Sequence, residues 1–303
     1  MAIYHGLSEY TAPKNGTSVA LGFFDGVHLG HRAVIGAAAD TQLSCVVLTF
    51  GENPLRVLGK DHPPTLTDNP RKAQLMTAAG ADDVIFADFM QLKDMSPEVF
   101  VGEILVGKLK AKRVVCGFNY RFGSRGSGDT EALKSLCADF GIEVIVCEPV
   151  SVGSEQVSSS RIRELIASGD IGSANTMLGY RYSISGDIGG GNRIGSALGF
   201  PTVNIPISDD IAIPCKGVYA SILTVGGESY TGATNIGVHP TVGETDSPIC
   251  ETFLIDFPGG DLYGSRAVCE LCEFIRGEKK FSSLDELTEQ IKLDCERIKR
   301  ILK

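Results

Sequence analysis

The chain has 303 residues, long enough for two domains of about 100–200 residues each, and 43% of them are hydrophobic, as in folded globular proteins. Its formal net charge of −9 argues against a general electrostatic grip on nucleic acid, which needs a basic surface. No apolar run approaches the roughly 18 residues of a membrane span, and the N-terminal segment lacks the form of a signal peptide. We therefore expect a cytoplasmic protein that binds neither nucleic acid nor membranes, and the sequence does not indicate its oligomeric state.

In the first half of the chain, apolar β-rich runs alternate with helical stretches. This alternation predicts a mainly parallel sheet with helices on both faces, an α/β doubly wound domain, in which ligands bind beyond the carboxyl ends of the strands. The expected strands are 18–24, 45–50, 82–87, 113–118 and 142–150, and the expected helices are 33–41, 71–80, 97–110 and 130–141.

Around residue 180 the pattern changes to short β-like runs separated by glycine-rich turns. The expected strands are 181–188, 217–225, 249–257 and 267–275, which predict an antiparallel β-barrel or sandwich. One or two short bridging helices within 160–179 precede it, so we expect the domains 1–179 and 180–303. Helical spacing of apolar residues after Lys280, behind a Ser-Ser start, predicts a C-terminal helix that covers the barrel.

The nine cysteines are scattered and odd in number, which indicates reduced, mostly buried thiols. Cys269 and Cys272 form a Cys-x-x-Cys pair, but residues three apart on a strand face opposite ways. No second pair is present to complete a zinc site. We expect neither a metal nor a redox role for this pair.

The segment GFFDGVHLGH at 22–31 lies where the first predicted strand ends and a helix begins. Free N–H groups at a helix start attract anions, and His28 and His31 can both point into the first turn. We expect this segment to bind the phosphates of a nucleotide, through the histidines and through Gly22, Phe23, Asp25, Gly26 and Gly30. The alternative role for Asp25 is to cap a turn.

This segment resembles the H-x-G-H signature of the nucleotidylyltransferase superfamily, and its longer form resembles the flavin adenylyltransferase branch. The resemblance implies a Rossmann-like fold and in-line attack of a substrate phosphate on the α-phosphate of ATP, without a protein nucleophile. His28 and His31 would then be catalytic residues that donate to the phosphates as pyrophosphate leaves, with Mg²⁺ sharing that role.

Two further segments are similar to the same family. GFNYRFGSRGSGD at 117–129 follows a predicted strand, and flavin contacts are expected there from Asn119, Arg121, Phe122, Arg125 and Asp129. VSSSRIR at 157–163 resembles an element whose hydroxyls and arginine contact triphosphate oxygens, a role that falls to Ser159, Ser160 and Arg163.

One position departs from the family pattern T-F-x-P-H-P, because this chain reads TFGENP at 49–54. Asn53 replaces a histidine on the flavin side of the site, where it can donate a hydrogen bond but cannot carry positive charge. A weaker or altered adenylyltransferase half is one consequence left open.

The second half contains no Walker motif and no protein-kinase motif. GNRIGSALGFPTVNI at 191–205 resembles the glycine-rich loop and P-T-A-N element of the riboflavin kinase family. The resemblance assigns ATP contacts to Gly199, Pro201 and Thr202, Mg²⁺ ligands to Thr202 and Asn204, and the general base to Glu251. Ser196 stands where relatives have an arginine, and either Arg193 replaces that charge or the loop binds nucleotide more weakly.

Together the motifs predict a transferase of flavin biosynthesis, which phosphorylates riboflavin to FMN and then adenylylates FMN to FAD. Its substrates and products would be riboflavin, FMN, FAD and ATP, and both steps would need Mg²⁺. Two alternatives stay open, namely that only one half is active and that the protein is a non-catalytic flavin sensor. The intact histidines, Thr202, Asn204 and Glu251 argue against a sensor.

Overall fold

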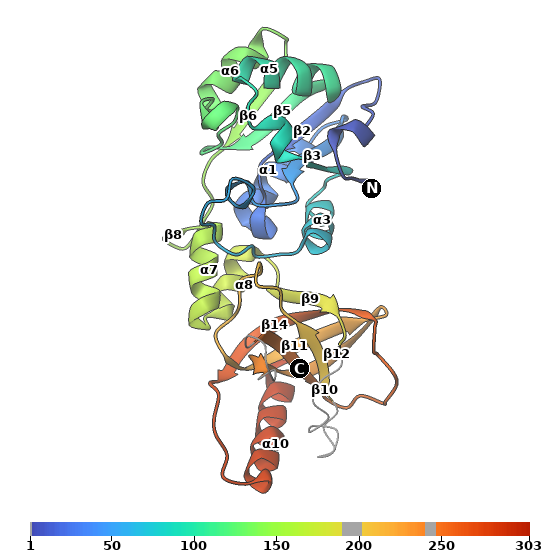
Figure 1. The fold of residues 1–303 in the computed structure, drawn as a ribbon, viewed down its shortest axis with the longest axis vertical. Helices are drawn as coiled ribbons and strands as arrows, with labels where there is room; N and C mark the ends of the chain where they lie inside the picture. The colour runs from blue at the N-terminus through green and yellow to red at the C-terminus, as the bar shows by residue number, and fades with distance from the viewer. Residues whose placement is uncertain (1, 190–201, 240–246) are drawn as a thin grey trace. The chain divides into compact units, whose positions relative to one another are not determined.

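The computed structural model describes residues 2–189, 202–239 and 247–303 (Figure 1). The chain divides into two compact units, Met1–Ser159 and Ser160–Lys303. The predicted domain boundary near Gly179 stays a prediction, since the compact units divide before the bridging helices and not after them.

The first unit is built on a six-stranded sheet with the order β1-β4-β3-β2-β5-β6, in which every pair is parallel. All five residues of β2, near the centre, are buried, as expected for a strand covered on both faces. The strands are β1 Ala2–Tyr4, β2 Thr17–Leu21, β3 Ser44–Phe50, β4 Asp83–Ala87, β5 Ala111–Gly117 and β6 Glu143–Cys147.

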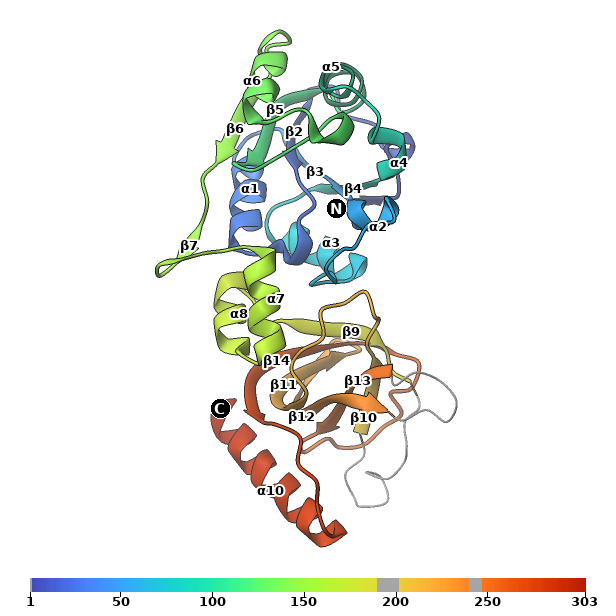
Figure 2. The same ribbon diagram turned by 60° about the vertical axis from the view of Figure 1, so that its left-hand side comes forward.

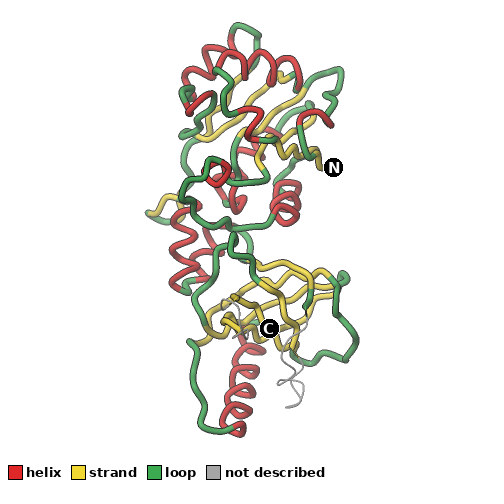
Figure 3. The backbone as a smooth tube through the Cα atoms, in the orientation of Figure 1, coloured by secondary structure: helices red, strands yellow, loops and turns green. Residues whose placement is uncertain are grey.

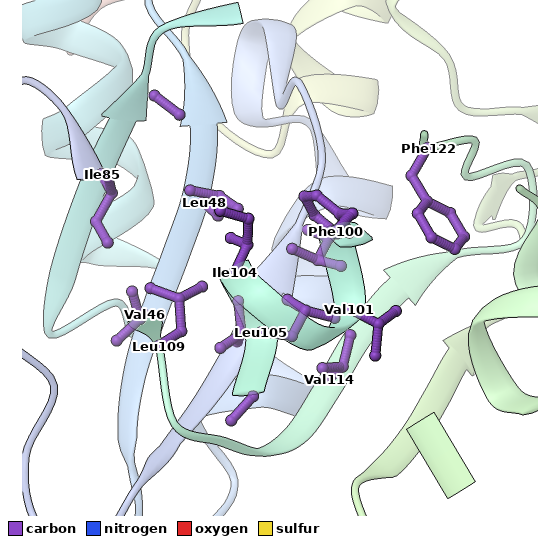
Figure 4. Packing of buried hydrophobic residues seen from close by; sticks show 14 of the residues in the cluster. Val46, Leu48, Ile85, Phe100, Val101, Ile104, Leu105, Leu109, Val114 and Phe122 are labelled. Carbon is purple, nitrogen blue, oxygen red and sulfur yellow. The ribbon is translucent and has the colours of Figure 1, made fainter. Parts of the chain in front are cut away.

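Helices cover both faces of this sheet (Figure 2). One face packs on α1 and α3, and the other packs on α6 and on the π-helical segment η3, whose apolar side chains are shown in Figure 4. The helices of this unit are η1 Leu7–Glu9, η2 Asp25–Val27, α1 Leu29–Ala39, α2 Pro54–Val57, α3 Asn69–Ala78, α4 Phe89–Leu92, α5 Pro97–Val99, η3 Phe100–Lys108, η4 Ser124–Gly126 and α6 Thr130–Ala138. The predicted doubly wound α/β domain is confirmed.

Two short strands and two helices follow, and both predicted bridging helices are present: β7 Ser151–Val152, β8 Glu155–Gln156, α7 Ser159–Ser168 and α8 Ile171–Leu178. Gly179 ends α8 in the left-handed conformation. The side chain of Asn175 on α8 donates to the carbonyl of Leu271 (2.9 Å) and accepts from the N–H of Tyr182 (2.6 Å). These bonds fasten α8 to the barrel within the second unit.

The second unit is a nearly closed antiparallel barrel with the strand order β10-β13-β12-β11-β14-β9 (Figure 3). The N–H of Gly189, just after β9, donates to the carbonyl of Asn204 in β10 (2.9 Å) and links the two ends of the sheet. The strands are β9 Ser183–Asp187, β10 Thr202–Pro206, β11 Gly217–Val225, β12 Glu228–His239, β13 Ser247–Leu254 and β14 Arg266–Arg276. The prediction of an antiparallel barrel is confirmed.

The C-terminal helix α10, Leu284–Ile301, packs on the outside of the barrel, as predicted. Ile298 is fully buried in a cluster with Ala220 and Ile275, and Asp294 pairs with Arg276 at 2.8 Å. The hydroxyl of Ser283 accepts the N–H of Glu286 and caps the helix.

All nine cysteines are free thiols. Cys269 lies inside the barrel beside the hydroxyl of Thr234 (3.3 Å), whereas Cys272 packs into the cluster under α10, so the pair does face opposite ways. In the described ranges, no group of three or more His, Cys, Asp or Glu side chains has the arrangement of a metal site. No helix there is both long and apolar enough to span a bilayer.

Gly217, at the start of β11, is a position where the barrel requires glycine. Its φ is +148°, and an added Cβ would lie 2.4 Å from the carbonyl oxygen of Arg276. Gly217→Ala should therefore lower the free energy of unfolding of the second unit by about 1–3 kcal/mol, measured by hydrogen exchange of the β11 amides. Gly277→Ala is the matched control, because no atom lies within 4 Å of its added Cβ; equal stability of the two variants would contradict the prediction.

Candidate active sites

A strained turn connects β2 to α1 at the carboxyl edge of the parallel sheet. Phe24 and Val27 have positive φ values of 53° and 38°, and Gly26 has a φ of 77°. A Cβ on Gly26 would lie 2.5 Å from Cδ1 of Leu66, so only glycine fits against that side chain. The turn places His28 at the N-cap of α1 and thereby brings both histidines to the helix start.

The two histidines form a stacked pair. Their ring centroids are 3.6 Å apart with planes at 16°, and Nδ1 of His28 accepts the N–H of His31 at 3.3 Å. Nδ1 of His31 is buried and has no hydrogen-bond partner among the described residues. Burial, followed by the neighbouring His28 and Lys72, holds the pKa of His31 well below its ordinary value. His31 is therefore neutral at physiological pH, when a ring can donate only one N–H.

Asp25 fixes the surrounding loops. Its carboxylate is buried, with Oδ1 accepting the N–H of Leu66 at 2.7 Å, and its carbonyl accepts the hydroxyl of Ser159 at 2.9 Å. Ser159 is thus bonded to the histidine turn, and its contact to a phosphate stays a prediction. Ser160, which is exposed, and Arg163, which is half-buried, belong to the second unit, so their phosphate contacts stay predictions.

Asn53 lies beyond the carboxyl end of β3, and its Oδ1 accepts the N–H of Leu55 at 3.0 Å. It therefore serves as the N-cap of α2, while its amide N–H₂ group has no hydrogen-bond partner among the described residues. The residue as a whole is almost fully buried. Its contact to a flavin stays a prediction.

The loop after β5 is the predicted flavin segment. Asn119, Arg121 and Arg125 are exposed on it, and Nη1 of Arg121 lies 3.8 Å from Oδ2 of Asp129. The hydrogen bond from the backbone N–H of Ala132 is the largest cause that lowers the pKa of Asp129, and Arg121 adds to it. Asp129 thereby caps α6.

Phe122 differs from the other members of this loop, because its ring is buried in the core. The ring lies 5.9 Å from that of Tyr120 and 5.5 Å from that of Phe100, and Figure 4 shows it beside Phe100. A Cβ on Gly128 would lie 2.6 Å from this ring, so the loop closes tightly over it. Phe122 anchors the loop, and its contact to a flavin also stays a prediction.

Lys72, on the first turns of α3, is a buried charged residue that the motifs did not reveal. Its side chain is only 3% exposed, its Nζ donates to the carbonyl of Phe50 at 3.0 Å, and Nζ lies 4.2 Å from the centre of the Phe23 ring. Burial lowers its pKa to about 7, although Asp25 opposes the shift. The sequence signal that could have indicated this burial is helical spacing, because Lys72 and Met76, four residues apart, lie on the same buried face of α3.

The second site lies on neighbouring strands of the barrel. Asn204 of β10 pairs directly with Glu251 of β13, and the hydroxyl of Thr202 donates to Oε1 of Glu251 at 2.8 Å. Oδ1 of Asn204 is buried without a hydrogen-bond partner in the described part of the chain. An orphaned amide oxygen beside a hydroxyl and a carboxylate fits a Mg²⁺ site. Gly199 and Pro201 lie outside the described residues.

Asn235 is a second residue that the motifs did not single out. It pairs directly with Glu251 from the other side, in β12. Directly paired residues of antiparallel strands project from the same face, so Asn204, Glu251 and Asn235 form a polar row across three strands. The motif TNIGVHPTVG at 234–243 contains Asn235, but only strand pairing reveals that it neighbours the carboxylate.

Comparison with known proteins supports the family resemblance of both halves of the chain. A family model described as FAD synthetase matches residues 11–161, and one described as riboflavin kinase matches residues 178–302. The bifunctional riboflavin kinase/FMN adenylyltransferase of Listeria monocytogenes is 36% identical over 283 residues, which cover 91% of this chain and 89% of that protein. The protein of the same name from Escherichia coli K12 is 33% identical, over 96% and 93% of the two chains.

A solved structure described as a macrolide-efflux protein from Streptococcus pneumoniae covers 98% of both chains, with a TM-score of 0.86 and 28% identity. The full-length match in fold and the two family models agree with the sequence relatives, which span nearly the whole chain. The motif resemblance is thereby confirmed. The chain belongs to the family of bifunctional riboflavin kinases/FMN adenylyltransferases.

Proposed function

We propose that this protein makes FAD in two steps, phosphorylating riboflavin with ATP at the barrel site and adenylylating FMN with a second ATP at the N-terminal site. The observation that carries the proposal is that one chain holds two different polar sites. In one site, two stacked histidines lie at the start of α1. In the other, the carboxylate of Glu251 accepts a hydrogen bond from Thr202 and lies between Asn204 and Asn235 on the neighbouring strands. These two arrangements suit different phosphate chemistries, and the two family models assign them to separate parts of the chain.

In the kinase step, Glu251 acts as the general base. Its carboxylate takes the proton of the riboflavin 5′-hydroxyl while that oxygen bonds to the γ-phosphorus of ATP, and the bond from the γ-phosphorus to the bridging oxygen breaks to release ADP. The hydrogen bond from Thr202 holds one carboxylate oxygen in place and leaves the other for the proton. Thr202 and Asn204 would hold Mg²⁺, which neutralises phosphate charge when bound.

In the adenylyl step, a phosphate oxygen of FMN bonds to the α-phosphorus of ATP, and the bond to the bridging oxygen of the β-phosphate breaks. The enzyme positions the reactants and stabilises the charge that develops on pyrophosphate. His28 and His31 contribute hydrogen-bond donors at the helix start, and Ser159 secures the turn that carries them. The exposed polar side chains after β5 would receive the flavin phosphate.

The groups that act on reacting charge are present in the described parts of both sites, which favours two active halves over a flavin sensor or a single active half. Asn53 uses its oxygen to cap α2 and keeps an N–H₂ donor, so the replacement of histidine does not leave the position without hydrogen-bonding capacity.

Two single substitutions should separate the two activities. Glu251→Gln should reduce FMN formation at least about 100-fold, because it removes the base, and should leave conversion of FMN to FAD unchanged. His31→Ala should do the reverse, because it removes a donor to the phosphates. Chromatography of products after incubation with riboflavin or FMN, ATP and Mg²⁺ measures both steps.

Glu228→Gln and His5→Ala are the matched controls, since both residues are exposed and lie outside the motifs. Loss of both activities from either active-site substitution would contradict two independent sites. Chelation of Mg²⁺ by EDTA should stop both steps, and full activity in EDTA would exclude a role for the cation.

Asn235 is expected to support the kinase step through its position beside Glu251. Asn235→Ala should lower kcat/KM for riboflavin about 10- to 100-fold, because the amide projects from the same face as Glu251 and a hydrogen bond from it to a charged group of the bound reactants would contribute about 1.5–3 kcal/mol. FAD formation from FMN should not change. Steady-state kinetics of both steps test this, with Asn15→Ala as the exposed control; an unchanged kcat/KM would remove Asn235 from the site.

A further inference from the structure

Lys72 lies at the same sheet edge as the histidine pair. Its Nζ contacts the carbonyl of Phe50, the last residue of β3, and the ring of Phe23, two residues beyond β2. Strands β2 and β3 are parallel neighbours, with Leu21 paired to Leu48, so their carboxyl ends coincide. The ammonium group is therefore at the edge where such a sheet binds its ligands.

The histidine pair cannot carry two positive charges at this edge. Two imidazolium rings 3.6 Å apart would repel each other, and the pKa of His31 is already held low by burial. The pair therefore offers hydrogen-bond donors with at most one positive charge, whereas departing pyrophosphate carries several negative charges. A buried cation nearby would complement these donors, since charge stabilisation is strongest away from water.

Lys72 has fewer hydrogen-bond acceptors than a buried ammonium group with a purely structural role would need. Among the described residues, Nζ has one hydrogen-bond acceptor, the carbonyl of Phe50, and faces aromatic rings otherwise. Burying an ammonium without a close ion pair is costly. Asp25 interacts with it electrostatically, but Oδ1 of that carboxylate is bonded to the N–H of Leu66. Two of the three N–H bonds of Lys72 thus make no hydrogen bond to the described residues.

We propose that Lys72 is a further catalytic residue of the adenylyl step, whose buried ammonium contacts the ATP phosphates and compensates their charge beside the histidine pair. The proposal rests on the proposed function of the N-terminal site. Aromatic rings, a carbonyl oxygen and a partly engaged carboxylate keep the lysine in place before the phosphates arrive.

Protonation of Lys72 should then limit the reaction at alkaline pH. The titratable groups that interact with it are the carboxylate of Asp25 from η2 and the ring of His31 from α1, and Asp68 and Arg71 lie near it along its own helix. With a pKa of about 7 in the free enzyme, Lys72 loses its proton as the pH rises through neutrality. Consequently kcat/KM for ATP in the adenylyl step should fall as the pH rises from 7 to 9, whereas bound phosphate raises the pKa and protects kcat.

The test uses Lys72→Met in the full-length enzyme, because methionine retains an unbranched chain of similar length without the charge. We expect kcat for FMN adenylylation to fall about 100- to 1,000-fold, as for removal of other charge-stabilising donors. The alkaline fall in kcat/KM should disappear, and riboflavin phosphorylation by the same preparation should be unchanged. Lys14→Met, at an exposed lysine before β2, should behave as the wild type in both reactions.

Adenylylation by Lys72→Met at the wild-type rate with the wild-type pH profile would overturn the proposal. If that variant does not fold, NMR of ¹⁵N-lysine-labelled wild-type enzyme decides, with the Lys72 signal assigned by its absence from Lys72→Arg. The pKa of Lys72 should rise by at least about one unit on addition of α,β-methylene-ATP, and an unchanged pKa would overturn the proposal. Failure of the proposed function itself is distinct, since the wild-type enzyme would then form no FAD from FMN.

Discussion

Parallel strand pairing is the constraint on which the N-terminal site depends. Because β2, β3 and β5 run in the same direction, segments that are far apart in the sequence begin at the same edge of the sheet. The histidine turn follows β2, the Asn53 segment follows β3, and the polar loop follows β5. None of these segments forms a phosphate site alone, and the sheet brings their starting points together before any ligand contact is made.

The barrel arranges its site by a different rule. Antiparallel pairing sets residues directly opposite each other, so Asn204, Glu251 and Asn235 become neighbours without any loop to position them. Their strands alternate faces, and the intervening residues Val203, Thr252 and Thr234 are buried. A carboxylate can therefore be held on one face of a strand while the opposite face contributes to the core.

The sequence predicted the two folds well, because period-two and helical spacing differ strongly between its halves and because the motifs follow predicted strands. It did not reveal Lys72, since a lysine on a short helix is normally solvated and its burial depends on packing against a distant strand end. Asn235 also required strand register. Asn53, Asp129 and Phe122 carry capping or packing roles as well, and motif letters do not show which atoms local structure already uses.

Hydrogen-bonded hydroxyl groups inside the barrel help to fix the register of its strands. Ser221 contacts Thr234 at 2.7 Å, and Thr234 contacts Thr252 at 2.8 Å, all without exposure to solvent. A shift of β13 by one residue would turn Thr252 outward and leave its partners without hydrogen bonds. The same shift would place the charged side chain of Glu251 in the interior of the barrel. The three buried hydroxyl groups thus help to specify the strand register that places the general base in the site.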